Sequence, residues 1–267
     1  MQETFPAQWQ YIRIILYLAG LLLFLFIESH ISYRKPTVSK LRRDVVNLCL
    51  TVMNGFFIYI FFSAMIMTAV SYTAEHKAGI LNLFNIPVFI NIIATVIFMD
   101  FMLYIWHLLN HKIPFLWKFH QVHHSDINMD TTTATRFHIG ELAISIVIRI
   151  SLIYFIGAGI AGLIIFECLL SMCAQFHHSS ITTTKAFDEW FRRCFVSPSM
   201  HRIHHSVKKS ERDSNYGTIF SIWDRILGTL KTEVSQSGIK IGLFAYQDSR
   251  HNTLASLMCM PFTKNEK

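Results

Sequence analysis

The sequence predicts an all-α integral membrane protein whose helices carry a histidine-rich site beside the membrane. Of its 267 residues, 52% are hydrophobic and 15% are charged, and the mean hydropathy is positive. Several uncharged runs reach the roughly 20 residues that a helix needs to cross the hydrocarbon core. Histidines gather in short clusters near the ends of these runs. We therefore expect residues 1–267 to form one membrane domain.

The formal charge of +7 does not favour nucleic acid as a partner. A basic groove on a soluble domain fits badly with 23 Phe and long uncharged stretches. An excess of cytoplasmic Lys and Arg in a membrane protein explains the same charge. The cysteines are odd in number and scattered, so we interpret them as reduced, buried, small hydrophobic residues. These are Cys49, Cys168, Cys173, Cys194 and Cys259.

Three full membrane spans are expected within residues 1–105. The first covers residues 11–31, and the N-terminus lacks the pattern of a cleaved signal peptide. Residues 34–43 hold five basic and no acidic side chains, which places this loop in the cytoplasm. Residues 45–72 then lead outward and residues 86–105 lead back. The first histidines, within residues 106–138, should therefore lie on the cytoplasmic side.

An apolar block over residues 139–175 is too long for one span and is interrupted by the sequence GAG, where helix propensity drops. We expect residues 139–176 to form a helical hairpin that dips into or crosses the membrane. Arg149 is costly in lipid and should face a polar partner, for which Glu141 is a candidate. Residues 177–267 should form a cytoplasmic helical cap, with residues 208–213 as a solvated loop.

The histidines follow the spacings HxxxH, HxxHH and HxxHH. On helices these spacings place imidazoles on one face, because residues three or four apart are neighbours. Neutral imidazole is the commonest side-chain ligand for zinc, copper, iron and nickel. A single zinc ion would need only three or four ligands, and neither HExxH nor CxxC is present. The pattern predicts more than one metal ion, bound by His107, His111, His120, His123, His124, His201, His204 and His205.

These motifs resemble the fatty acid hydroxylase and sterol desaturase superfamily of membrane-bound di-iron oxygenases. The resemblance covers roughly residues 42–230 and includes NYG (215–217) and WDRILGT (223–229) after the last histidine motif. TRFH and FHHS also lie where the family carries isolated histidines. The resemblance implies two bound iron ions and adds His178 to the ligands. It leaves His138 either as a ligand or as a residue that orients a ligand or faces substrate.

Other polar residues have less specific interpretations. Ser180 stands where the family usually has asparagine, and His177 is expected to be a neighbour of the metal site and not a ligand. Asp100 precedes the first histidine motif and could orient an imidazole or make only a buried pair. Asp224 could support the site or form a salt-bridged cap. We expect a structural or solvated role for His30, His76 and His251.

The resemblance implies that the protein uses O2 to hydroxylate a C–H bond of a lipid. Since no sequence motif for flavin, haem or an iron–sulfur cluster is present, electrons should come from a separate reductase or carrier. Lys208, Lys209 and Arg212 are candidate docking charges for that partner. Desaturation at the same site is the main alternative. A non-catalytic metal binder would repeat charged or thiol residues in its spans, and a zinc hydrolase would need a carboxylate base such as Glu141. Sterol, fatty acyl, sphingoid and ether lipids all remain candidate substrates.

Overall fold

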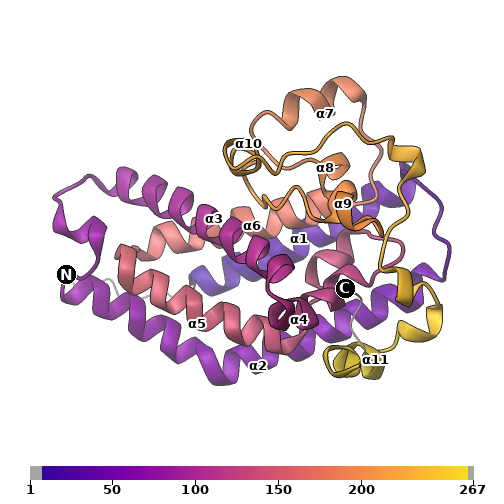
Figure 1. The fold of residues 1–267 in the computed structure, drawn as a ribbon. Helices are drawn as coiled ribbons and strands as arrows, with labels where there is room; N and C mark the ends of the chain where they lie inside the picture. Colours follow the sequence, from indigo (N-terminus) through magenta and orange to yellow (C-terminus); the bar gives the residue numbers. More distant parts are fainter. Residues whose placement is uncertain (1–7, 264–267) are drawn as a thin grey trace.

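The protein is an all-α membrane protein, described here from a computed structural model that covers residues 8–263. Long helices run side by side, and short helices gather at one end of them (Figure 1). Within the described residues, five helices are long and apolar enough to cross a membrane. The long helices are α1 (Gln8–His30), α2 (Lys40–Glu75), α3 (Val88–Lys112), α5 (Ile139–Ile156) and α6 (Ile160–His178).

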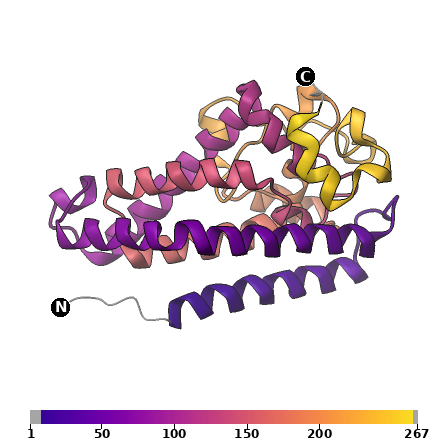
Figure 2. The same ribbon diagram turned by 90° about the horizontal axis from the view of Figure 1, so that it is seen from below.

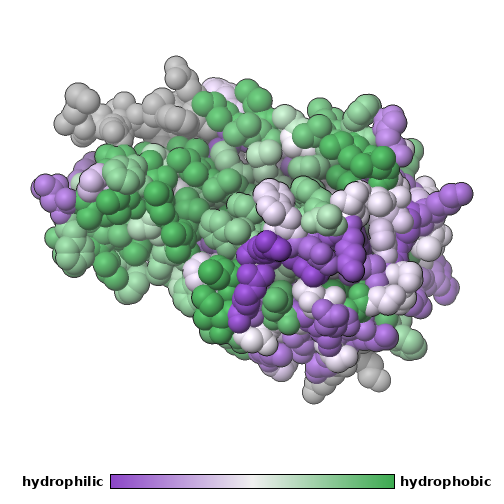
Figure 3. All heavy atoms as spheres, turned by 90° about the horizontal axis from the view of Figure 1, so that it is seen from above, coloured by the Kyte–Doolittle hydropathy of each residue, from purple (hydrophilic) through white to green (hydrophobic). Residues whose placement is uncertain are grey.

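The outer surface of the long helices is apolar. Large side chains such as Leu22, Phe56, Val88 and Phe155 are exposed on it. Figure 3 shows hydrophobic side chains over one end of the molecule and hydrophilic ones over the other. Exposed apolar area of this extent is unusual for a soluble monomer and fits contact with lipid. The helix α1 lies on the flank of the bundle, where it packs against α6 (Figure 2).

Two helices extend beyond the predicted spans and thereby reach the histidines. The 36 residues of α2 correspond to about 54 Å, more than the ~30 Å hydrocarbon core requires. Arg43 and Asn47 in its first turns are buried against the loop that follows α4 (Pro114–His124). The helix α3 continues to Lys112 because residues 88–113 contain no Gly or Pro. The next proline, Pro114, starts α4. Its last two turns carry the HxxxH motif.

The predicted hairpin consists of α5 and α6, which meet at Gly157. This residue has a left-handed conformation with φ of +73°, which glycine adopts without a steric penalty. Gly79, with φ of +92°, packs directly against it from the turn between α2 and α3. The Asn82 amide, in the 3-10 helix η1 (Ile80–Leu83), donates to the carbonyl oxygens of Ala78 and Gly157. The two turns therefore fix the end of the bundle that is far from the histidines.

The cap wraps around the other end of the bundle in short helices (Figure 1). Its α-helices are α7 (Lys185–Phe191), α8 (Pro198–His204), α9 (Lys209–Arg212), α10 (Ile222–Ile226) and α11 (Leu254–Cys259). Its 3-10 helices are η3 (Gln236–Gly238), η4 (Phe244–Tyr246), η5 (Ser249–His251) and η6 (Met260–Phe262), and η2 (Thr131–Thr135) precedes the hairpin. Leu257 of α11 packs against Leu50 of α2 and Val122 of α4. The C-terminal segment thus covers the outside of α4.

Two expectations were wrong in detail. Residues 208–213 are not wholly a solvated loop, because they include α9, where Glu211 accepts a hydrogen bond from Ser206 and Arg212 lies buried over the Trp117 ring. The cysteines are free, as expected, but they are not all buried. Cys49, Cys194 and Cys259 are exposed. Cys49 lies on α2, where an apolar stretch also has a lipid-facing side, whereas Cys194 and Cys259 lie on the surface of the short segments of the cap.

Candidate metal centre

Nine histidines meet where α3, α4, α6 and α8 approach one another at the cap end of the bundle. Among the described residues, these histidines form two groups. Within each group, every histidine offers one ring nitrogen, and these nitrogens all lie within 4.8 Å of one another. The five-histidine group is His107, His111, His120, His124 and His204. The four-histidine group is His123, His178, His201 and His205.

The two HxxHH motifs divide their residues between the groups in opposite ways. On α4, His120 and His124 join the five-histidine group and His123 joins the other. On and just after α8, His201 and His205 join the four-histidine group, while His204 joins the five-histidine group. Residues four apart share a helix face, whereas the adjacent third residue points about 100° away. Each motif therefore serves both groups, and the rings of His124 and His205 stack with centroids 4.4 Å apart.

Backbone carbonyls of the cap orient two of the imidazoles. The Nδ1 atom of His107 lies 2.8 Å from the carbonyl oxygen of Tyr216, and that of His204 lies 2.7 Å from the carbonyl oxygen of Ser214. If Nδ1–H donates to each carbonyl, the lone pair of each ring is on Nε2. The segment after the last histidine motif thus sets the tautomer of residues from two different helices.

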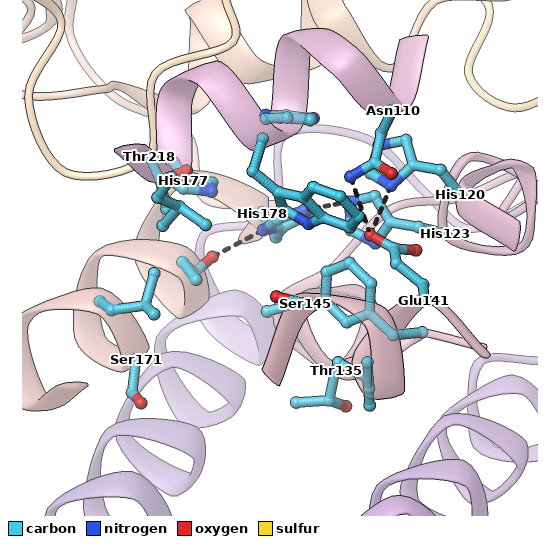
Figure 4. Close-up of a pocket in the computed structure, with 18 of the residues that line it drawn as sticks. Asn110, His120, His123, Thr135, Glu141, Ser145, Ser171, His177, His178 and Thr218 are labelled. Carbon is cyan, nitrogen blue, oxygen red and sulfur yellow. Dashed lines mark hydrogen bonds and ion pairs between the residues drawn. The ribbon is translucent and has the colours of Figure 1, made fainter. Parts of the chain in front are cut away.

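The hairpin orients two more imidazoles. Oε1 of Glu141, in the first turn of α5, lies 2.9 Å from Nδ1 of His120. The Ala174 carbonyl of α6 lies 2.7 Å from Nδ1 of His178. In each case the hydrogen bond leaves Nε2 of the imidazole free to bind a metal ion. Figure 4 shows Glu141, His120 and His123 together at the upper end of a cavity.

The imidazole nitrogens fit a metal centre because they lack other partners. In the five-histidine group, Nε2 of His107, His120 and His204 is buried without a hydrogen-bond partner. Unpaired buried polar atoms are costly, and native structures rarely leave several of them together. In the four-histidine group, Nε2 of His178 lies 3.1 Å from that of His123 and 2.9 Å from that of His201. Lone pairs that converge in this way are stabilised by a cation between them.

Burial also keeps the histidines of α4 and α8 neutral. Loss of hydration lowers the pKa of His123, His124, His201, His204 and His205 well below the ordinary value of 6.5, and neighbouring imidazoles lower it further. At neutral pH these rings therefore carry a lone pair and no positive charge. That is the protonation state that metal binding requires.

A cavity of about 250 Å³ leads from the histidines into the membrane-spanning bundle. Leu103, Trp106, Phe137, Leu142 and Leu170 supply apolar walls. The labelled side chains of Figure 4 include His120, His123 and His178 above and Ser145, Ser171 and Thr135 below them. An apolar chain could therefore approach the histidines from within the bundle.

Several other candidates lie outside both groups. Nδ1 of His138 accepts from the backbone N–H of Gly140 at the start of α5, and its Nε2 lies 3.2 Å from the Met258 carbonyl. The structure therefore does not bring His138 to the metal groups. His177 lies beside His201, with ring centroids 4.0 Å apart, and lines the cavity without joining a group. The outlying residues His30, His76 and His251 are exposed.

The two candidate aspartates hold the cap in place without touching an imidazole. Asp100 of α3 accepts from the Ile219 and Phe220 N–H groups and from the Trp223 indole. Asp224 accepts from the backbone N–H of Tyr216, and burial raises the pKa of its carboxyl group. Because the Tyr216 carbonyl bonds His107, Asp224 acts on the centre only through this backbone segment. The sequence pattern did not indicate that these two carboxylates would accept hydrogen bonds from backbone N–H groups of the cap.

Sequence reasoning also missed the long-range partners of several polar side chains. Glu141 pairs with His120, and the partner of Arg149 is Glu167, at 3.3 Å. Arg43, which contributed to the topology prediction, also forms a buried pair with Asp126 just after α4. Burial opposes ionisation of Asp126, but Arg43 and a second nearby guanidinium outweigh it and hold the pKa of that carboxyl well below its usual range. Sequence distance conceals these contacts, because they join separate elements.

Comparisons with known proteins identify related sequences. The family described as Fatty acid hydroxylase matches residues 92–229. The chain is 28% identical to an ornithine lipid hydroxylase of Rhizobium tropici, over 59% of the chain and 46% of that relative. It is 29% identical to an alkylglycerol monooxygenase of Caenorhabditis elegans, over 51% of the chain and 26% of the relative. It is 26% identical to human cholesterol 25-hydroxylase, over 53% of the chain and 52% of the relative.

The chain therefore spans about half the length of these relatives or less. No solved structure was found to match it.

Proposed function

The chain belongs to the fatty acid hydroxylase family, and from this premise we propose that it is a di-iron oxygenase that hydroxylates a C–H bond of a lipid. The reaction would use O2 and electrons from a separate donor. The observation that carries the proposal is the position of two adjacent histidine groups at the inner end of an apolar cavity. Nitrogen ligands suit redox-active transition metals, and the cavity suits an apolar substrate.

The names of the relatives favour hydroxylation over desaturation. They describe an ornithine lipid hydroxylase, an alkylglycerol monooxygenase and a cholesterol hydroxylase. All three names denote addition of oxygen, and each names a lipid. For this chain we accordingly keep desaturation as the second candidate reaction.

The nine grouped histidines would hold the two ions. Bound iron would supply the activation of O2 and the oxidation of the C–H bond. The protein would keep each imidazole in position, and Glu141 has this role for His120. The same contact argues against a zinc hydrolase, because a carboxylate that orients a ligand is not free to act as a base. His177 lines the cavity beside the site and would face the substrate.

The cavity walls would exclude water and orient the lipid. Leu103, Leu142 and Leu170 line the path between the histidines and the membrane-spanning part of the bundle. A lipid could therefore enter from the bilayer without crossing the polar cap. The basic loop of residues 34–43 supports a cytoplasmic position for the cap and the metal centre.

The electron donor would dock on the cap. Lys208 and Lys209 are exposed and remain candidate docking charges. Arg212 does not fit this role, because its side chain is buried over Trp117.

Lipid mass spectrometry under labelled dioxygen tests the reaction. Membranes from cells with and without the protein are compared after growth in labelled O2. A lipid that gains one labelled oxygen atom only when the protein is present supports hydroxylation. Loss of two hydrogens without label supports desaturation instead, and no difference between the membranes contradicts an oxygenase. His124→Ala provides the inactive control, because it removes one proposed ligand.

A further inference from the structure

A cluster of charged side chains joins three of the membrane-spanning helices, α1, α5 and α6. Glu167 of α6 pairs with Arg13 of α1 at 2.8 Å and with Arg149 of α5 at 3.3 Å. Arg149 and Glu167 both lie near the middle of their helices. Two guanidinium groups thus face one carboxylate, so the cluster carries a net charge of +1.

A net charge at this depth needs an explanation, because uncompensated charge within a membrane is costly. One Arg and one Glu would already form a neutral pair. The second guanidinium, that of Arg13, is 45% exposed near the start of α1, and an anion that joined the cluster would neutralise its charge. Guanidinium groups bind carboxylate and phosphate oxygens through paired hydrogen bonds, so the missing anion would be of that kind.

The cluster lines a cavity of about 360 Å³ between α1, α2, α5 and α6. Among the described residues of its wall, Arg13, Arg149 and Glu167 are the charged ones. This cavity adjoins the one beneath the histidines, since they share part of their walls. The shared residues are Tyr17, Leu142, Ser145, Arg149, Leu170 and Ser171. Ser145 and Ser171 are visible below the histidines in Figure 4.

One face of α5 lines both cavities, so the two cavities form one path. Glu141, Ser145 and Arg149 recur every four residues and therefore share one face of α5. Glu141 contacts the metal centre through His120, and the eight residues from Glu141 to Arg149 correspond to about 12 Å. On α6, Glu167 and His178 are eleven positions apart, which corresponds to about 16 Å. The charged cluster is thus roughly 12–16 Å along the bundle from the histidines.

We propose that Arg13, Arg149 and Glu167 form the binding site for an anionic oxygen group, a carboxylate or a phosphate, on the lipid substrate. Its alkyl chain would extend along the apolar path to the metal centre. An extended chain advances roughly 1.3 Å per C–C bond of about 1.5 Å, so the oxidised carbon would lie about 9–12 bonds from the anion. This proposal rests on the proposed function, because it takes the histidines as the place of oxidation.

Binding to the metal-free protein tests the proposal. The full chain, in nanodiscs of phosphatidylcholine, is titrated with isotope-labelled palmitate, palmitoyl lysophosphatidate and methyl palmitate. Empty nanodiscs correct for partition into lipid. At least one of the two anions should bind about tenfold or more tightly than the neutral ester, as expected for charge-assisted hydrogen bonds. Preference for palmitate assigns a carboxylate, and preference for lysophosphatidate assigns a phosphate. Equal binding of all three probes overturns the proposal.

Variants separate recognition from a structural role. Arg149→Gln should reduce binding of the preferred anion to the level of the ester, whereas Glu167→Gln should strengthen it by removing the competing carboxylate. Arg42→Gln is the matched control, because Arg42 is exposed on α2 outside both cavities. If Arg149→Gln does not fold, Arg13→Gln replaces it, since the Arg13 side chain is 45% exposed. Retained anion preference in a folded arginine variant overturns the proposal.

The experiments distinguish failure of the proposed oxygenase function from failure of the proposed anion site. The binding assay needs neither iron nor turnover, so anion preference without any labelled product would contradict the oxygenase alone. Labelled products that form equally well from palmitate and its methyl ester would contradict the anion site alone.

Discussion

Glu141 Oε1 lies 2.9 Å from Nδ1 of His120, and both residues are buried. This pair joins the membrane hairpin to α4, the helix that contributes histidines to both groups. The carboxylate of Glu141 holds the His120 ring with Nε2 directed at the five-histidine group. The hairpin therefore contributes to the candidate metal centre as well as to the membrane-spanning bundle.

Removal of this carboxylate should weaken the centre. We expect Glu141→Ala to lower iron affinity or turnover by about 10–100-fold, the usual effect of losing a residue that orients a ligand. Glu141→Gln should retain more activity, because its amide oxygen can still accept a hydrogen bond. Iron titration and lipid turnover measure the two effects. Equal activity of Glu141→Ala and the unmodified protein would contradict this role.

Each histidine group should lose its metal separately. His124→Ala should remove about one iron ion by weakening the five-histidine group, and His205→Ala should do the same for the four-histidine group. Metal analysis of the purified variants measures the loss. His76→Ala is the control, because His76 is exposed and far from both groups. If His124→Ala or His205→Ala removes both ions or neither, the division into groups is wrong.

Acidification should destabilise the metal-free protein. The folded pKa values of His123, His124, His201, His204 and His205 lie below the unfolded value of about 6.5. Below that pH the unfolded chain binds more protons than the folded one. The contribution of these histidines to the free energy of unfolding is therefore fully present above about pH 6.5 and is lost as the pH falls below it. Denaturation midpoints at pH 8, 7, 6 and 5.5 test this. A midpoint that is constant or rises on acidification would contradict it, and a His123→Ala, His205→Ala double variant should flatten the slope.

The carboxylate of Asp100 should stabilise the cap on α3. Asp100→Ala would leave the Ile219 N–H, the Phe220 N–H and the Trp223 indole without their acceptor. We expect the free energy of unfolding to fall by about 2–5 kcal/mol, since each unpaired buried donor is costly. Chemical denaturation in detergent measures the change. Asp248→Ala is the control, because Asp248 lies on the surface and bonds the exposed Arg250 beside it. An Asp100 variant as stable as this control would exclude the proposed role.

The contact between the turns at Gly79 and Gly157 should leave no room for a side chain at Gly79. A Cβ atom at Gly79 would lie 2.2 Å from the backbone nitrogen of Gly157, and its φ of +92° disfavours other residues. We expect Gly79→Ala to destabilise the protein by about 1–3 kcal/mol. Gly55→Ala, at a helical position with open space, should be neutral or stabilising. Thermal unfolding of both variants compares them, and equal midpoints would show that the turns can separate.

Sequence reasoning located the spans and the ligand types because both depend on local patterns. Apolar runs gave α1, α2 and α3, and the sequence GAG gave the break between α5 and α6. Histidine spacing also drew attention to residues that the fold brings together. The division of each HxxHH motif between two groups was not predictable, because it depends on how α4 and α8 face each other.

Long-range polar partners were equally inaccessible from the sequence. His120 with Glu141 and His107 with the Tyr216 carbonyl join segments that have no shared local pattern. Arg149 was recognised as needing a partner, but Glu167 was not identified because nothing in the spacing favours it over Glu141. His138 is the last residue of the family-like motif TRFH, yet its ring caps the start of α5.

The iron content of the purified protein tests the central claim most directly. The full chain, produced with abundant iron and purified in mild detergent, is measured by elemental analysis against protein concentration from amino-acid analysis. Two groups of histidines with converging nitrogens predict two iron atoms per chain. One metal atom per chain or fewer, after this iron-replete preparation, would contradict a two-ion centre.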